Sequence, residues 1–205
     1  MHDLIGICGL IGSGKSAVAR QVADAGFCVI HADDEAHVLY AKNQDVRAQM
    51  AQAFGSEVLT ETGVDRVRLG NLVFADSGEL AKLEAIIHPA LARHLQERLN
   101  QELSLHTVFL EAALLPKWPD LLARCDQVWQ VESSEALRLA RIMERGLSEE
   151  AATQRIRKQD SFPPIVHKNF IQICNEGSLS GLQSQIARLL RSGRFWNQDL
   201  ANKCR

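Results

Sequence analysis

The sequence lacks several features that would place the protein in a specialised class. No uninterrupted apolar run reaches the roughly eighteen residues that a membrane-spanning helix needs. The N-terminus shows no charged segment followed by a cleavable apolar one, so a signal peptide is not expected. The net charge is only −2, without the basic excess that is typical of nucleic-acid binding. We therefore expect neither a membrane nor a nucleic acid as a partner.

A pattern of paired cysteines is also missing. The five cysteines are odd in number, widely spaced and never arranged as Cys-x-x-Cys; they are Cys8, Cys28, Cys125, Cys174 and Cys204. Three of them lie in apolar runs, which is typical of reduced thiols packed in a core. The cysteines therefore favour a cytoplasmic protein, which we expect to be a monomer or a weak homo-oligomer.

The apolar runs that are present predict an α/β fold. The 205 residues, 46% apolar and 23% charged, suffice for one α/β domain with insertions. Short apolar runs predict five strands, at residues 4–8, 27–30, 107–111, 126–131 and 169–174. Because helical segments alternate with them, we expect a parallel five-stranded sheet flanked by helices, with ligands beyond the carboxyl ends of the strands.

Two segments between the strands have a strongly helical pattern. Residues 35–100 are almost entirely helical, with breaks expected at 54–55, 61–63, 76–78 and His88-Pro89. This insertion is far longer than an ordinary crossover, so we expect a subdomain with its own task. Residues 134–160 form an Arg-rich helical stretch that divides near Gly146, where Ser148 is expected to cap a new helix. A closing helix is expected at 179–190, and residues 192–205 show no regular pattern.

The strongest motif lies between the first strand and the first helix. Gly9, Gly14, Lys15 and Ser16 fit G-x-x-x-x-G-K-[ST], the phosphate-binding P-loop. Glycines let the backbone fold around a phosphate, and several N–H groups then point inward at a helix start. Lys15 adds a mobile positive charge, and the Ser16 hydroxyl can hold Mg²⁺. The sequence therefore predicts ATP binding by the loop, that is by Gly9, Gly12, Ser13, Gly14, Lys15, Ser16 and the adjoining Ala17.

Two acids at expected strand ends are candidates for chemistry. Asp33, after the second strand, can accept a proton from an acceptor hydroxyl, or Asp33 or Asp34 can simply cap the helix that starts near Glu35. Glu111 closes the third strand in the manner of an acid that holds Mg²⁺, or it caps a strand end. The residues alone leave both alternatives open.

Arginines on the 134–160 segment form a second candidate feature. Arg138, Arg141 and Arg145 are spaced so that they share one face of a helix. A mobile lid with arginines can neutralise the charge of phosphoryl transfer and exclude water, although most arginine faces are simply solvated. Together with the P-loop, the pattern favours a lid.

These motifs together resemble the dephospho-CoA kinase family, whose members phosphorylate the ribose 3′-hydroxyl of dephospho-CoA with ATP. The matches run from Gly9 to Gly177, and the most specific are Leu83-Glu84-Ala85-Ile86-Ile87-His88-Pro89 and Asp65-Arg66 followed by Leu69. The others are Ala32-Asp33, Phe54-Gly55, Leu114-Leu115, Arg141 with Arg145, Arg155-Ile156 with Gln159, and Asn175 with Gly177.

The resemblance implies three regions and a set of residue roles. The regions are a nucleotide-binding core (1–34, 101–132 and 164–205), a helical acceptor-binding subdomain (35–100) and an arginine-bearing lid (133–163). Asp33 is implied as the base that faces the 3′-hydroxyl. Arg66, His88 and Leu115 are implied on the dephospho-CoA side, Arg141 beside the transferred phosphate, and Arg145 and Asn175 with ATP, Asn175 by the adenine.

Several positions depart from the family's pattern. His31 stands where the family usually has Asp, and Ala17 where threonine is usual. Glu111-Ala112-Ala113 replaces the start of an Asp-x-Pro-Leu-Leu element, with Lys117 in place of an acid, and Arg138 stands where Gln is usual. The resulting prediction is an ATP- and Mg²⁺-dependent kinase acting on dephospho-CoA. Another small P-loop kinase of the nucleoside or shikimate type, or a weakened ATP-binding regulator, remains the alternative.

Overall fold

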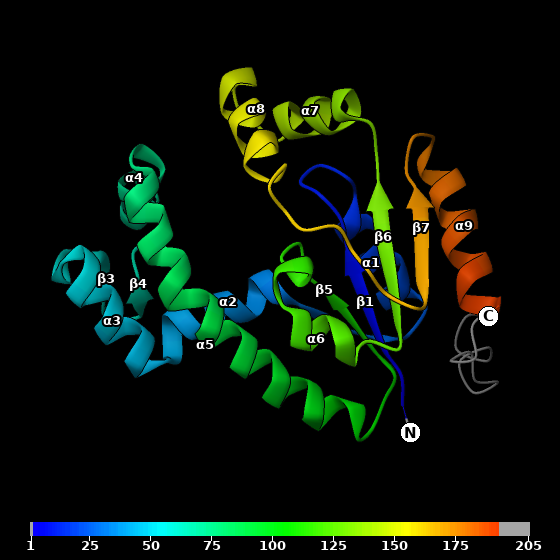
Figure 1. Cartoon of the computed structure of the whole chain (residues 1–205), viewed down its shortest axis with the longest axis horizontal. Coiled ribbons are helices and arrows are strands. Elements are labelled where there is room, and N and C mark those ends of the chain that lie inside the picture. Colours follow the sequence, from blue (N-terminus) through cyan, green and yellow to red (C-terminus); the bar gives the residue numbers. More distant parts are fainter. Residues whose placement is uncertain (1, 193–205) are drawn as a thin grey trace. The chain divides into compact units, whose positions relative to one another are not determined.

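The computed structural model describes residues 2–192, and the expectations for the 193–205 tail lie outside this range. The described residues fall into two compact units, which divide between Ile30 and His31 and again between Arg98 and Leu99. Among the described residues, the first unit comprises residues 2–30 and 99–192, and the second comprises His31–Arg98. The helices and strands of both units are labelled in Figure 1.

A five-stranded sheet forms the centre of the first unit, and all five expected strands are confirmed. They are β1 (Leu4–Cys8), β2 (Cys28–His31), β5 (Val108–Glu111), β6 (Gln127–Glu132) and β7 (Phe170–Cys174). The spatial order is β2-β5-β1-β6-β7, with β1 parallel to both β5 and β6, and β6 parallel to β7. The strand before the phosphate loop is therefore the central one, and it is buried along its whole length.

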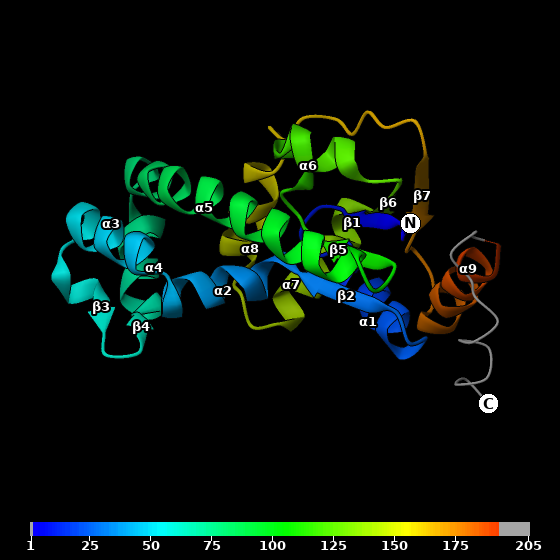
Figure 2. The same cartoon turned by 90° about the horizontal axis from the view of Figure 1, so that it is seen from below.

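Helices cover both faces of this sheet, which explains why the inner strands β1 and β5 are nearly continuous apolar runs. On one face lie α1 (Lys15–Asp24) and α9 (Leu179–Ser192), whose apolar side chains share a buried cluster with Ile5, Phe109 and Trp129. Phe109 meets Trp129 edge to face at 5.3 Å between ring centroids. The 3₁₀ helix η2 (Leu115–Lys117) and α6 (Pro119–Arg124) belong to the opposite face (Figure 2). There Gly6 leaves no room for a side chain, since a Cβ would lie 2.5 Å from Leu115 Cδ2.

The Arg-rich segment forms two helices, as expected. These are α7 (Glu135–Glu144) and α8 (Glu149–Lys158), and the Ser148 Oγ accepts a hydrogen bond from the Ala151 N–H as the expected N-cap. The two helices pack around Ile142, Ala152 and Ile156, and Ile11 of the phosphate loop packs against the same cluster.

The second unit is mainly helical, as expected, and contains one element that the pattern missed. Its helices are α2 (Ala32–Lys42), α3 (Gln44–Phe54), the 3₁₀ helix η1 (Ser56–Val58), α4 (Arg66–Ala75) and most of α5 (Ser77–Leu103). A short antiparallel hairpin, β3 (Leu59–Thr60) with β4 (Gly63–Val64), turns where only a break was expected. Met50 is fully buried in this unit.

The expected break at His88-Pro89 is wrong, because α5 continues through Pro89. Proline removes one helical hydrogen bond and costs about 3 kcal/mol in a helix interior. Ile87, Leu91 and Leu95 are buried at successive four-residue intervals around it. Each such side chain contributes about 1.5–3 kcal/mol on burial, so the apolar stripe outweighs the proline.

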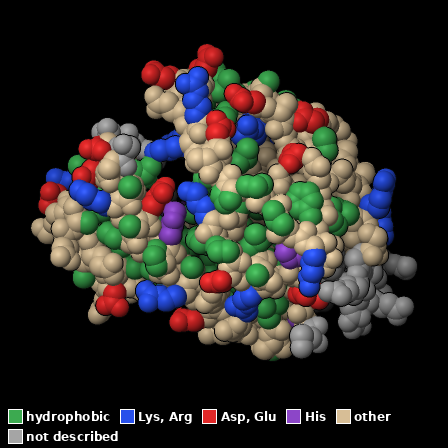
Figure 3. Space-filling view, viewed as in Figure 1, with side chains coloured by type: hydrophobic (Ala, Val, Ile, Leu, Met, Phe, Trp, Pro, Cys, Tyr) green, Lys and Arg blue, Asp and Glu red, His purple; other side chains and the backbone are tan. Residues whose placement is uncertain are grey.

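The surface carries charges of both signs. On the face shown in Figure 3, Lys and Arg side chains are interspersed with Asp and Glu. Within residues 2–192, no helix combines the length and apolar character that crossing a bilayer demands.

Candidate active site

The phosphate loop folds as the motif predicts. Gly9, Gly12 and Gly14 have φ angles of +147°, +79° and +100°, which side-chain-bearing residues rarely adopt. Gly14 is the N-cap of α1, so the helix begins at Lys15. The loop thus joins the carboxyl end of the central strand directly to a helix N-terminus.

This loop presents unpaired backbone donors. Within residues 2–192 the N–H groups of Gly12, Gly14 and Ser16 have no hydrogen-bond partner, and the first turn of α1 carries no acid. The Lys15 Nζ lies 3.4 Å from the Leu10 carbonyl oxygen, to which it donates. Unpaired N–H groups, the positive end of the helix dipole and a lysine together form an anion-binding site.

The glycines are also required by the close approach of neighbouring elements. A Cβ on Gly14 would lie 2.2 Å from the Asn175 Nδ2, and one on Gly12 would lie 2.7 Å from the Arg138 carbonyl oxygen. Both distances are far below a normal van der Waals contact. The loop is therefore fitted closely against the residue after β7 and against α7.

Arg141 and Asn175 hold the loop by its carbonyl groups. The Arg141 Nη1 donates to the carbonyl oxygens of Gly12 and Ser13 at 3.3 and 3.4 Å. Its Nη2 donates to the Asn175 carbonyl oxygen at 2.9 Å. The buried Asn175 side chain donates from Nδ2 to the Ser13 carbonyl oxygen at 2.8 Å. The structure thus brings two predicted site residues, Arg141 and Asn175, to Ser13 of the loop, which lies 128 and 162 positions away from them in sequence.

A residue that received no role from the sequence also contacts the loop. The Ile11 N–H donates to the Gln159 Oε1 at 2.5 Å, from a position just after α8. Because Ile11 also packs on the α7–α8 cluster, both helices of the expected lid are attached to the loop. Gln159 belonged to the family pattern, but no local signal indicated which group it contacts.

The other two arginines of α7 have different environments. Arg138 is buried, 7% exposed, and its Nε and Nη1 have no partner among the described residues. Arg145 is exposed at the C-cap of α7. Of the three arginines that share a helix face in sequence, the structure attaches only Arg141 to the loop by hydrogen bonds from its side chain.

The expected metal ligands have suitable chemistry. Glu111 ends β5 next to the central strand and is 8% exposed, and Ser16 is exposed in the first turn of α1. Both supply oxygen atoms, which Mg²⁺ prefers. No group of three or more His, Cys, Asp or Glu side chains within residues 2–192 could hold a metal. Two oxygen donors leave the other coordination positions of such an ion to phosphate oxygens and water.

Asp33 belongs to the second unit. It lies in the first turn of α2, whose N-cap is His31, so the alternative in which Asp33 or Asp34 caps this helix is wrong. Asp33 is exposed, and its side chain has no hydrogen bond or ion pair within the described chain. It lines a pocket of about 430 Å³ whose walls include Tyr40, Leu69 and Val73.

The residues implied on the acceptor side have different positions and different degrees of burial. His88 is half-buried within α5. Arg66 is the first residue of α4, and its side chain lies outside the described atoms. Its neighbour Asp65 caps that helix by accepting from the N–H groups of Val67 and Arg68. Leu115 is fully buried against Gly6, so its side chain has a packing role.

The fold and the loop together define the class of protein. The parallel sheet carries a G-x-x-x-x-G-K-S loop between its central strand and the first helix, and an arginine-bearing helix is bound to that loop. These features define the class of P-loop kinases. A family model described as Dephospho-CoA kinase matches residues 3–180. The chain therefore belongs to the dephospho-CoA kinase family.

Individual relatives agree with this assignment. The dephospho-CoA kinase of Carboxydothermus hydrogenoformans is 31% identical over 196 residues, which cover 94% of this chain and 95% of the relative. A crystal structure from Thermus thermophilus superimposes with a TM-score of 0.68 at 31% identity, covering 94% of this chain and all of that one. The dephospho-CoA kinase of Campylobacter jejuni shares the fold, with a TM-score of 0.64 at 23% identity over 93% of this chain and 96% of its own.

Proposed function

We propose that this protein transfers the γ-phosphoryl group of ATP to the ribose 3′-hydroxyl of dephospho-CoA, giving coenzyme A and ADP. The observation that carries the proposal is the phosphate loop with its unpaired N–H groups in a chain of this family. The family match favours this acceptor over those of nucleoside or shikimate kinases.

In this proposal the loop region binds ATP and offsets the charge of the transferred group. The N–H groups of the glycine-rich loop bind the phosphates, and Lys15 and Arg141 offset charge on the transferred phosphoryl oxygens. The Arg141 contacts to the Gly12 and Ser13 carbonyls support this role, because they hold the guanidinium at the loop. Asn175 is assigned to the adenine end of ATP, and Arg145 at the end of α7 is assigned to its phosphates.

Asp33 is the proposed general base. It accepts the proton of the 3′-hydroxyl as the oxygen attacks phosphorus, so that the hydroxyl O–H bond breaks while the new P–O bond forms. The support is that Asp33 is exposed, has no internal partner and lines a pocket with space for part of an acceptor. Arg66 and His88 are assigned to acceptor binding in the same unit.

Mg²⁺ is the proposed cofactor, with Ser16 and Glu111 as its protein ligands. When bound, it neutralises charge on the ATP phosphates. We assign residues 1–34, 101–132 and 164–205 to the nucleotide-binding core, 35–100 to acceptor binding and 133–163 to the lid. We also propose a cytoplasmic location, since Cys8, Cys125 and Cys174 are free thiols, and a monomer or weak homo-oligomer.

The decisive experiment combines product identification with a matched pair of variants. Mass spectrometry of a reaction with dephospho-CoA, ATP and Mg²⁺ should detect a product phosphorylated at the 3′ position. Asp33→Asn should lower kcat by about 10²–10⁴-fold, because general-base help is lost. Asp34→Asn is the control, since Asp34 is exposed in the same helical turn.

Two outcomes would contradict the proposal. ATP binding without a phosphorylated product would indicate a nucleotide-binding regulator. A change of less than about threefold in kcat for Asp33→Asn would show that this carboxylate is not the base.

A further inference from the structure

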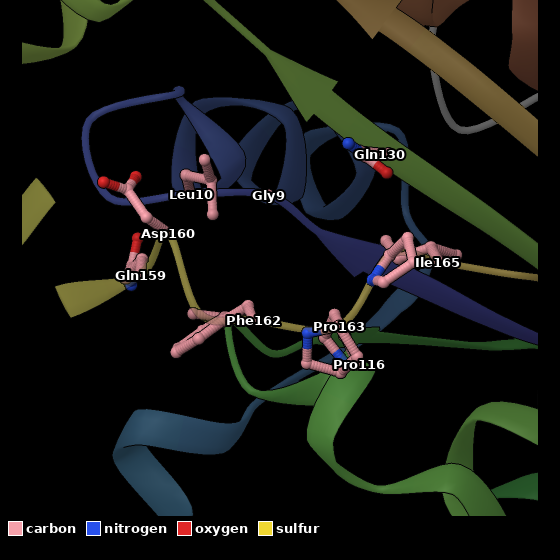
Figure 4. Close-up of a pocket in the computed structure, with 11 residues that line it drawn as sticks. Gly9, Leu10, Pro116, Gln130, Gln159, Asp160, Phe162, Pro163 and Ile165 are labelled. Atoms are coloured by element: carbon pink, nitrogen blue, oxygen red, sulfur yellow. The ribbon is translucent and has the colours of Figure 1, made fainter. Parts of the chain in front are cut away.

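A pocket of about 340 Å³ adjoins the start of the phosphate loop and lies wholly in the first unit. Figure 4 shows Gly9 and Leu10 along one side of it, with Phe162, Pro163 and Pro116 opposite. Its volume is near the lower end of the roughly 300–1,000 Å³ range of small-molecule sites. Its lining includes Asp160 and neither Lys nor Arg. A neutral group therefore suits this pocket better than a phosphate.

Two glutamines line this pocket, and contacts within the chain fix how their amides are oriented. The Gln130 Nε2 donates to the Glu132 Oε1 at 2.6 Å, and a carboxylate can only accept. The Gln130 Oε1 is therefore left as an acceptor. The Gln159 Oε1 accepts from the Ile11 N–H, so its Nε2 is left as a donor. Neither remaining amide atom has a partner within residues 2–192.

The apolar residues of the lining suit a flat, weakly polar ring. Phe162 offers an aromatic surface to the pocket. The Lys117 Nζ lies 4.5 Å from the centroid of the Phe162 ring, a cation–π contact that restrains the ring. Pro116, Pro163 and Ile165 add apolar surface. A base that stacks on an aromatic ring and forms hydrogen bonds at its edge is the ligand that such a lining recognises.

We propose that this pocket binds the adenine of the acceptor nucleotide, an inference that rests on the proposed function. Adenine carries an amino group that donates and ring nitrogens that accept, which complements the Gln130 Oε1 and the Gln159 Nε2. The adenine of ATP is assigned to Asn175, which does not line this pocket, so the second base needs a second subsite. Gln159 thereby becomes a specificity residue for the acceptor.

The test separates the donor function of Gln159 from its contact with the loop. Gln159→Glu keeps an oxygen to accept from the Ile11 N–H but replaces the donor by a second acceptor. We expect the KM for dephospho-CoA to rise about tenfold or more, while the KM for ATP stays within about twofold. Gln154→Ala is the control, because Gln154 is exposed on α8 and has no partner there. An unchanged acceptor KM, or an equal rise in the KM for ATP, would overturn the assignment.

A binding measurement distinguishes failure of the subsite from failure of the proposed function. Adenosine and inosine are titrated calorimetrically into protein saturated with ADP, which occupies the ATP site. Inosine has an oxygen where adenosine has the amino group, so it should bind about tenfold more weakly opposite the Gln130 Oε1. Equal affinities would overturn the subsite whether or not dephospho-CoA is phosphorylated. An inactive wild type with the adenosine preference intact would overturn only the proposed function.

Discussion

The close fit of the phosphate loop against α7 can be tested with one methyl group. In Gly12→Ala the added Cβ would lie 2.7 Å from the Arg138 carbonyl oxygen and 2.9 Å from its Cα. Both are backbone atoms, so a side-chain rotation cannot relieve the contact. The loop or the helix has to move, and the substitution should weaken both folding and ATP binding.

The expected size of the effect follows from two contributions. Holding a non-glycine residue at φ +79° costs about 1–2 kcal/mol, and forcing a group into a filled space costs about 1–3 kcal/mol. The free energy of unfolding should therefore fall by about 2–5 kcal/mol. The KM for ATP should rise as well, because the N–H groups of the loop are displaced from their positions.

Two other glycines supply matched controls. Gly146 has φ +95° but no atom within 4 Å of an added Cβ, so Gly146→Ala should cost only the conformational contribution of about 1–2 kcal/mol. Gly177 has neither a left-handed φ nor a close neighbour, so Gly177→Ala should change stability by less than about 0.5 kcal/mol. Urea unfolding measures all three variants. Equal losses for Gly12→Ala and Gly146→Ala would refute the proposed contact with α7.

Three further predictions concern the thiols and Asn175. Burial raises the pKa of Cys8 and of Cys125 to about 12, so iodoacetamide at pH 8 should label the exposed Cys174 and spare these two in the native protein, as peptide mapping would show. The unfolded thiols ionise near their ordinary pKa of 9.0, while the native ones keep their protons to a higher pH. The free energy of unfolding should therefore fall as the pH rises from about 9 to about 12. The fall should be less steep in Cys125→Ala, which has only one buried thiol of this kind. Asn175→Asp replaces the buried donor to the Ser13 carbonyl by an acceptor and should cost about 1–3 kcal/mol in urea unfolding, whereas Asn169→Asp, which affects an exposed hydrogen bond, should cost less.

Features set by nearby residues could be predicted from the sequence. The strand–loop–helix unit follows from Gly9, Gly14 and Lys15, because these residues act within one short segment. The Ser148 cap and the break at Gly146 are likewise local. All five strands of the sheet were expected because each contains a short apolar run, which can be recognised without knowing its neighbours; β1 and β5 are buried along their whole length, whereas β7 at the edge is partly exposed.

Features set by contacts between distant segments could not be predicted in the same way. The Ile11–Gln159 hydrogen bond joins residues 148 positions apart. The sequence around neither residue indicates that the two are in contact. The burial of Arg138 depends on how α7 docks, which a charge pattern does not encode. The expected break at Pro89 failed for a related reason, since the apolar stripe around it contributes more than the proline removes.

The packing of Ile11 against Ile142 and Ile156 has a consequence for engineering. Ile11 of the phosphate loop is part of the apolar cluster that α7 and α8 share, so these two helices cannot be exchanged as an independent unit. A chimera that imports residues 133–163 from a relative would also need the donor's residue at position 11. Without that change at position 11, the imported helices would pack against a side chain whose shape does not match theirs.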